Sequence, residues 1–184
     1  YELGAPAGVT LADAVKTWAG LPLAFQPGTA WCYSVSTDVL GRLVEVLSGQ
    51  SLDVFLAERI LGPLGMVDTA FGLAEDQRSR LAALHVPDPA SRKAVRFDEL
   101  APVSRTVPSF LSGGGGLVST ADDYLRFCDF LLRQGERNGV RLLSPRTVDY
   151  MTRNHLPGGS DLAGYARSMF AETAYAGVGF GLGF

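Results

Sequence analysis

A chain of 184 residues, of which 47% are apolar and 19% are charged, is long enough and apolar enough to bury the core of one domain. Its formal net charge of −3 removes the electrostatic basis for strong nucleic-acid binding. No run reaches the roughly 18 consecutive apolar residues that a membrane-spanning helix requires. The composition predicts a globular domain without a nucleic-acid partner and without a membrane span.

Two helices are predicted in the first 50 residues. Thr10 is a typical N-cap for an amphipathic helix that ends at Gly20. After a turn, Ser36 or Thr37 caps a second helix, which Gly49 ends.

A third helix is expected to begin at Ser51 or Asp53 and to break at Gly62 and Pro63. Residues 71–112 contain scattered prolines and no sustained period. That stretch is therefore predicted to be mostly loop, with one helical turn at residues 76–84.

The helical pattern returns at Thr120, which caps a helix that runs to Gly135. Ser144 and Pro145 begin another helix, because proline fits the first helical position. A short extended piece is expected after Met66, and residues 178–184 are expected to be extended. The chain is thus predicted to be mainly α, with about five helices, short strands and the start of a sheet strand near its C-terminus.

Common motifs for metals and nucleotides are missing. His85 and His155 are the only histidines and have no ligand-like spacing, so no metal site is predicted. The glycine run 113–116 lacks the lysine of a phosphate-binding loop, and no G-x-S-x-G sequence occurs. No cofactor is expected, and the glycines predict a tight bend or a close backbone approach.

Four further residues receive structural interpretations. Cys32 and Cys128 are too few for a disulfide scaffold, and both are expected to be buried thiols. Asp122 and Asp123 are interpreted as acids that complement the helix dipole, not as a catalytic pair.

The segment 27–40, which contains Tyr33, resembles the second active-site motif of the serine β-lactamase and penicillin-binding-protein superfamily. Within that superfamily it is most similar to the class C β-lactamase-like branch, which includes many carboxylesterases. Segments 40–49, 60–71, 115–124 and 141–148 resemble further family blocks in the family's order and spacing. The resemblance implies that the chain is the helical lobe of an α+β serine β-lactamase/DD-peptidase-like fold.

The resemblance also assigns site residues. In the family, the serine of an S-x-x-K motif attacks an acyl carbon, while its lysine and a tyrosine share the proton transfers. Tyr33 matches that catalytic tyrosine. Ser34 and Val35, which follow it, are expected at the substrate cleft.

The glycines Gly114, Gly115 and Gly116 match a family segment that edges the same cleft, where small residues are expected to leave an open acyl pocket.

No serine in this chain has a lysine three residues later. Residues 1–184 are therefore expected to be one partial domain, with the nucleophile motif before Tyr1 and the third motif after Phe184. The chain by itself is expected to be inactive and, because its terminal apolar segments lack a sheet to pack on, to self-associate.

Ester hydrolysis is the first functional hypothesis, because the valine at position 35 replaces the asparagine that binds the side chain of a β-lactam in related lactamases. The expected substrate is a small-molecule ester. A β-lactamase or D-alanyl peptidase is the alternative, and a non-catalytic binding module with the same fold is the alternative from another class. Without its natural N-terminus the sequence predicts no compartment.

Overall fold

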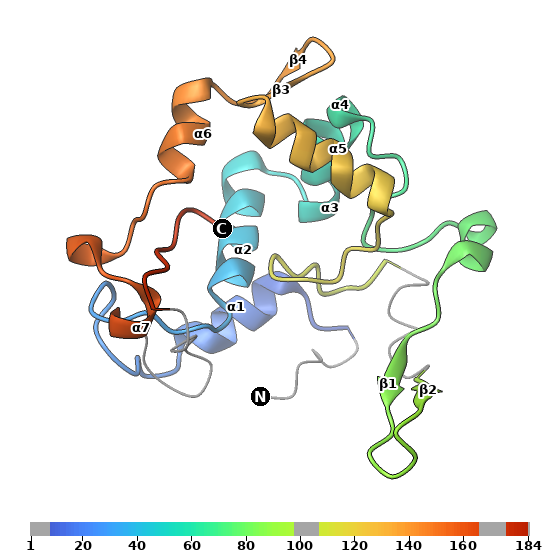
Figure 1. The fold of residues 1–184 in the computed structure, drawn as a ribbon, viewed down its shortest axis with the longest axis horizontal. Coiled ribbons are helices and arrows are strands. Elements are labelled where there is room, and N and C mark those ends of the chain that lie inside the picture. The colour runs from blue at the N-terminus through green and yellow to red at the C-terminus, as the bar shows by residue number, and fades with distance from the viewer. Residues whose placement is uncertain (1–7, 98–106, 166–175, 184) are drawn as a thin grey trace.

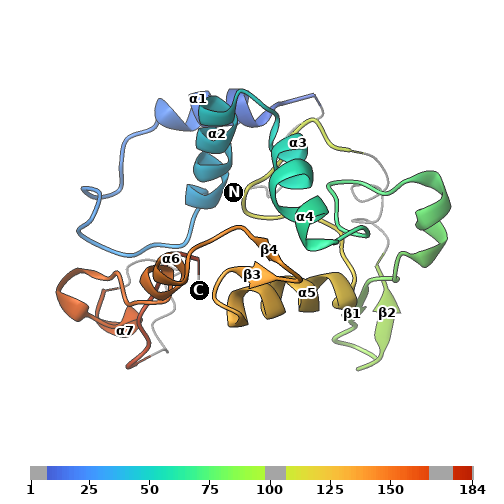
Figure 2. The ribbon, with the colours of Figure 1, turned by 90° about the horizontal axis from the view of Figure 1, so that it is seen from above.

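The computed structural model describes residues 8–97, 107–165 and 176–183 (Figure 1). Figure 2 shows α1, α2 and α3 on one side of the molecule and α5, α6 and α7 on the other. None of the helices in the described ranges combines the length and hydropathy that a bilayer crossing requires. In chain order the elements are α1 (Leu11–Ala19), α2 (Ser36–Ser48), α3 (Leu52–Leu56), a π-helical turn (Ala57–Leu61), α4 (Gly62–Leu64), a 3-10 helix (Glu75–Arg80), β1 (His85–Pro87), β2 (Ala94–Arg96), α5 (Ala121–Leu132), β3 (Glu136–Arg137), β4 (Val140–Arg141), α6 (Pro145–Met151), a 3-10 turn (Pro157–Gly159) and α7 (Leu162–Tyr165).

Three of the predicted helix starts are confirmed by their caps. The Thr10 hydroxyl accepts a hydrogen bond from the backbone N–H of Asp13, whose carboxylate accepts one from the Thr10 N–H in return. Thr120 and Ser144 cap α5 and α6 in the same way, each through its hydroxyl and the N–H three residues later. At α2, however, Val35 occupies the N-cap position without a side-chain hydrogen bond.

The predicted break at Gly62 and Pro63 is wrong. The helix passes through the π-helical turn Ala57–Leu61 and continues to Leu64. We attribute this to the widened turn, which separates the proline ring from the preceding carbonyls. The helix ends at Gly65, whose φ of 71° is left-handed.

Two short hairpins interrupt the loops, and neither was predicted. β1 pairs with β2, with His85 opposite Arg96, and β3 pairs with β4. Strands of two or three residues are too short for an alternating pattern to stand out in the sequence. The first hairpin projects away from the helices (Figure 1), and the helical turn expected at residues 76–84 is the 3-10 helix Glu75–Arg80.

The extended C-terminal segment does not form a strand over residues 176–183. Its backbone instead bonds to the end of the helical part of the chain. The N–H groups of His155 and Leu162 donate to the carbonyls of Phe180 and Val178, each at 2.8 Å, and the Leu182 N–H donates to the Met151 carbonyl at 2.8 Å. The mainly helical prediction is confirmed, but this strand is not present in the described residues.

The apolar interior forms two clusters and leaves one helix face uncovered. One cluster contains Leu11, Leu52, Phe71 and Leu111, and the other contains Leu61, Leu64, Met66 and Phe130. The apolar stripe of α2 remains exposed, through Val39, Leu40, Leu43, Val46 and Leu47.

Cys128 is exposed and Cys32 is half-buried, so the expectation that both cysteines are buried thiols is wrong. Cys128 lies on α5, whose neighbouring Leu125 and Leu132 are also exposed.

Candidate active site

Tyr33 lies in an extended segment that leads into α2, and 59% of it is exposed. The segment is tied to the C-terminal part of the chain just before this tyrosine. The Trp31 N–H donates to the Tyr165 carbonyl at 3.0 Å, and the Trp31 ring meets the Phe180 ring edge-on at 5.6 Å. These contacts fix the approach of the chain to α2 and leave Tyr33 open to solvent.

Ser34 and Val35 connect Tyr33 to the helix. Ser34 is exposed and Val35 is half-buried. The Val35 carbonyl accepts the first α2 hydrogen bond, from the Val39 N–H at 3.1 Å. Tyr33 therefore stands directly before the helix N-terminus, where the helix dipole favours negative charge.

The glycine run reaches the same end of α2 from 80 residues further along the chain. A Cβ on Gly113 would lie 2.2 Å from the Thr37 carbonyl oxygen, and a Cβ on Gly41 would lie 3.1 Å from the Gly113 Cα. The two backbones can approach this closely only because both positions are glycine. The predicted close approach of the run is therefore confirmed, and its partner is the first half of α2.

Asp38 holds the run in place and was not recognised in the sequence. Its carboxylate accepts hydrogen bonds from the Ser112 hydroxyl at 2.5 Å and from the Gly114 N–H at 3.3 Å. The Gly114 N–H also donates to the Ser112 oxygen at 3.1 Å. An acid in the first turn of a helix was the only signal in the sequence, and most such acids face solvent.

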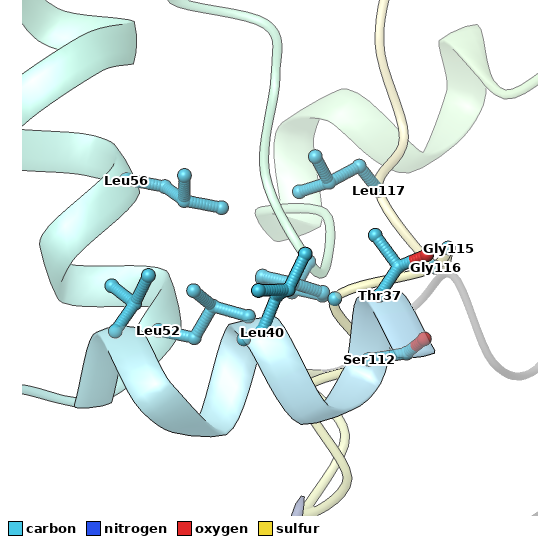
Figure 3. A pocket seen from close by; sticks show the side chains of 12 residues that line it. Thr37, Leu40, Leu52, Leu56, Ser112, Gly115, Gly116 and Leu117 are labelled. Atoms are coloured by element: carbon cyan, nitrogen blue, oxygen red, sulfur yellow. The ribbon is translucent and has the colours of Figure 1, made fainter. Parts of the chain in front are cut away.

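Gly115 and Gly116 border a groove, which we call the α2 groove. Its volume is about 330 Å³, and it lies between α2, α3 and the glycine run (Figure 3). Gly114 is next to the groove in sequence but does not line it. The lining residues are Thr37, Leu40, Gly41, Val44, Leu52, Leu56, Phe71, Ser112, Gly113, Gly115, Gly116 and Leu117.

The wall of the groove opposite α2 is held by backbone pairing. The Ala70 N–H donates to the Val118 carbonyl at 3.1 Å, and the Val118 N–H donates back at 2.9 Å. Phe71 and Leu117, the adjacent residues, both line the groove.

Asp123 holds the segment that precedes Ala70 in this pairing. It is completely buried. Its carboxylate accepts hydrogen bonds from the Asp68 N–H at 2.7 Å and the Thr69 hydroxyl at 2.9 Å, and it pairs with Arg126. The Thr69 hydroxyl also bonds to that of Ser119 at 2.7 Å. The interpretation of Asp123 as a helix-dipole acid missed this role, because Asp68 and Thr69 lie more than 50 residues away in the sequence.

Asp68 and Asp161 are two of the four described carboxylates outside the groove whose pKa values are lowered. The Arg80 guanidinium binds the Asp68 carboxylate through two hydrogen bonds, of 2.7 and 2.8 Å, and lowers the pKa of Asp68. The N–H groups of Gly177 and Gly164 lower the pKa of Asp161. Both carboxylates support neighbouring segments, and neither lines the groove.

The structure thus brings the second-motif tyrosine and the glycine run to one end of one helix. The described residues contain no group of three or more potential metal ligands. The chain's two lysines, Lys16 and Lys93, follow Asp13 and Ala90 at the three-residue spacing, so the sequence contains no S-x-x-K motif. A phenol, backbone amides and an apolar groove can serve proton transfer and acyl binding, but they do not provide an activated serine.

Comparison with known proteins gives a consistent result. The Beta-lactamase family model matches residues 2–184. An uncharacterized protein of Mycobacterium tuberculosis is 42% identical over 164 residues, which cover 89% of this chain and 39% of that protein. Lovastatin esterase of Penicillium rubens is 36% identical over 154 residues, covering 82% of this chain and 37% of the esterase.

Among solved structures, EstCE1, described as a hydrolase with promiscuous acyltransferase activity, superimposes with a TM-score of 0.70 at 25% identity. The match covers 97% of this chain and 46% of EstCE1. The chain therefore spans less than half the length of each of these relatives.

Proposed function

Because the chain belongs to the Beta-lactamase family, whose helical lobe it forms, we propose that it is part of a serine hydrolase that acts on small carboxylic esters. The observation that carries the proposal is the position of Tyr33, which is exposed three residues before the start of α2, the helix whose first half the glycine run approaches closely. The names of two relatives, lovastatin esterase and the hydrolase EstCE1, support ester chemistry.

In the proposed reaction Tyr33 moves a proton. A serine oxygen forms a bond to the acyl carbon, and its proton passes by way of the tyrosine to the alcohol, which leaves as the ester C–O bond breaks. Water then hydrolyses the acyl-serine. A phenol, with an ordinary pKa near 10, needs a neighbouring cation to act as a base at neutral pH.

Neither the serine nor the cation is supplied by an S-x-x-K motif of this chain. We therefore place both in a part of the protein outside the chain. Residues 1–184 are then expected to be inactive alone, since an isolated tyrosine has no nucleophile to activate.

Val35 favours an ester over a β-lactam or a D-alanyl peptide. It is half-buried at the N-cap of α2, and its side chain has no group that could bind an amide. The complete protein is accordingly expected to cleave p-nitrophenyl acetate faster than nitrocefin. The reverse order would favour the lactamase or peptidase alternative.

A non-catalytic binding module with the same fold is the competing proposal. The two are separated by mass spectrometry of the complete protein after incubation with p-nitrophenyl acetate. An added acetyl group on a serine supports the hydrolase. A protein that is never acylated and releases no nitrophenol supports the module.

The role of Tyr33 is tested by Tyr33→Phe in the complete protein. Loss of a general acid–base group costs about 10²- to 10⁴-fold in rate, so kcat for p-nitrophenyl acetate should fall by at least about 100-fold, with the melting temperature unchanged. Tyr124→Phe is the matched control, because Tyr124 is 63% exposed and lies on α5. Undiminished activity in Tyr33→Phe overturns the assignment.

A further inference from the structure

The position of Tyr33 depends on the residues that precede it in the chain. Its side chain is exposed, and no hydrogen bond or ring contact with another described residue holds it. Two residues earlier, the Trp31 N–H donates to the Tyr165 carbonyl, and the Trp31 ring meets the Phe180 ring edge-on. The Tyr165 hydroxyl also donates to the Gly28 carbonyl. The loop that carries the tyrosine is therefore held by α7, which lies beside it in Figure 1, and by the C-terminal segment.

Asn154, which follows α6, attaches this C-terminal segment to the helical part of the chain. Its side-chain oxygen accepts hydrogen bonds from the N–H groups of Phe180 at 3.1 Å and Leu156 at 3.0 Å. Its amide nitrogen donates to the Ser160 carbonyl at 2.8 Å. A Cβ on Gly179 would lie 2.5 Å from the Asn154 Cγ, so the segment approaches this closely only because that residue is glycine. An aspartate in place of the asparagine would set two acceptors against each other at the Ser160 carbonyl.

Asp161 attaches the beginning of the same segment to α7. Its two carboxylate oxygens each accept one hydrogen bond, from the N–H groups of Gly177 and Gly164, both at 2.7 Å. Both bonds favour the charged carboxylate, which lowers the pKa of Asp161. An asparagine here would replace one acceptor oxygen by an NH₂ group, so one of the two N–H groups would face a donor.

We call Asn154, Asp161 and residues 177–180 the C-terminal clasp. Asn154 binds the backbone of the last residue of the segment, and Asp161 binds that of the first. Between them, the Val178 carbonyl accepts a hydrogen bond of 2.8 Å from the first residue of α7. A segment that is bound along its whole length presents the aromatic ring of its last residue to Trp31 in a fixed position.

We propose that Asn154 and Asp161 are positioning residues for Tyr33. Through the clasp they hold Trp31 in place, and Trp31 in turn fixes the backbone that carries the tyrosine. This inference rests on the proposed function, in which Tyr33 moves a proton. Proton transfer requires the two heavy atoms to lie about 2.6–3.2 Å apart, and a misplacement of about 1 Å can cost about 100-fold in rate.

The kinetic consequence concerns the chemical steps and not the binding of the ester. Formation and hydrolysis of the acyl-serine both move a proton, so a displaced Tyr33 slows both steps. Variants of the clasp should therefore lower kcat and leave KM unchanged.

The first experiment measures kcat and KM of the complete protein for p-nitrophenyl acetate in Asn154→Asp and Asp161→Asn. Each substitution should lower kcat at least about tenfold. Asp149→Asn is the matched control, because Asp149 lies on nearby α6 but its exposed carboxylate pairs with Arg153 instead of the clasp. The control should leave kcat unchanged.

The same two substitutions in the Tyr33→Phe background separate positioning from a merely structural role. If the clasp acts through the Tyr33 hydroxyl, it has nothing left to position once that hydroxyl is removed, and kcat of Tyr33→Phe should not fall further. An equal further fall in this background overturns the inference. So does an unchanged kcat in both clasp variants, or a rise in KM alone, while ester hydrolysis stands.

A second experiment does not depend on catalysis. The complete protein is prepared with 3-fluorotyrosine at position 33, and its ¹⁹F NMR line is compared among the parent, the two clasp variants and Asp149→Asn. A change of chemical shift or line width in the clasp variants, but not in the control, supports positioning of residue 33 by the clasp, even if Tyr33→Phe keeps full activity. An unchanged line in both clasp variants, or an equal change in the control, overturns it, whatever the fate of the proposed function.

Discussion

Replacing Asp123 by alanine removes the buried carboxylate that joins α5 to the segment at Asp68 and Thr69. The Thr69 hydroxyl keeps its bond to Ser119, and the Arg126 side chain, 35% exposed, can regain water. The main cost is that the Asp68 N–H is left without an acceptor, which destabilises the fold by about 1–3 kcal/mol. Breaking the ion pair with Arg126 adds part of the cost of breaking a buried pair. The free energy of unfolding should therefore fall by about 3 kcal/mol.

The measurement is urea and thermal unfolding of the chain, in which about 3 kcal/mol corresponds to a fall in melting temperature of about 6–12 °C. Asp122→Ala is the matched control, because Asp122 is the preceding residue in the same helical turn but is exposed. It loses only a dipole interaction, of about 0.3–1 kcal/mol. Equal losses in the two variants would refute the assignment of Asp123 as the residue that holds the groove wall.

Three further outcomes are expected. Gly113→Ala should destabilise the chain by about 1–3 kcal/mol, because its Cβ would lie 2.2 Å from a backbone oxygen of α2, whereas Gly115→Ala should be near neutral in urea unfolding. Because Arg80 lowers the folded-state pKa of Asp68, the resulting stability is present above the unfolded-state pKa of about 3.9 and is lost as pH falls through the lower folded value. Arg80→Ala should therefore make the melting temperature less dependent on pH between about 5 and 2. The isolated chain should self-associate through the exposed face of α2, which light scattering would detect as a mass above that of the monomer. Leu47 is 77% exposed on this face, and Leu47→Gln should reduce the association. A monomeric mass for the unsubstituted chain contradicts this prediction.

Local sequence signals located most helices well. Thr10, Thr120 and Ser144 cap the helices they were predicted to cap, because a cap involves only residues three or four positions apart. The same reasoning failed at Pro63, because a change from α-helical to π-helical geometry depends on how the whole turn packs.

The candidate site divided in a similar way. The segment around Tyr33 and the glycine run were found by resemblance to known motifs, while their joint position at the N-terminus of α2 appeared only in the structure. Asp38 was missed, because its hydrogen-bond partners Ser112 and Gly114 lie more than 70 residues away. The catalytic and cleft roles of these residues remain predictions.

The sequence by itself determined that this chain is mainly helical, that the segment around Tyr33 resembles the second motif of the family, and that no S-x-x-K motif occurs in it. Those properties depend on residue type and on short separations along the chain. Tertiary structure alone decided that the apolar stripe of α2 stays exposed, that Asp123 is buried, and that a groove runs from the N-terminus of α2 toward α3. Burial and close approach depend on segments distant in sequence, and no local pattern specifies which of them meet.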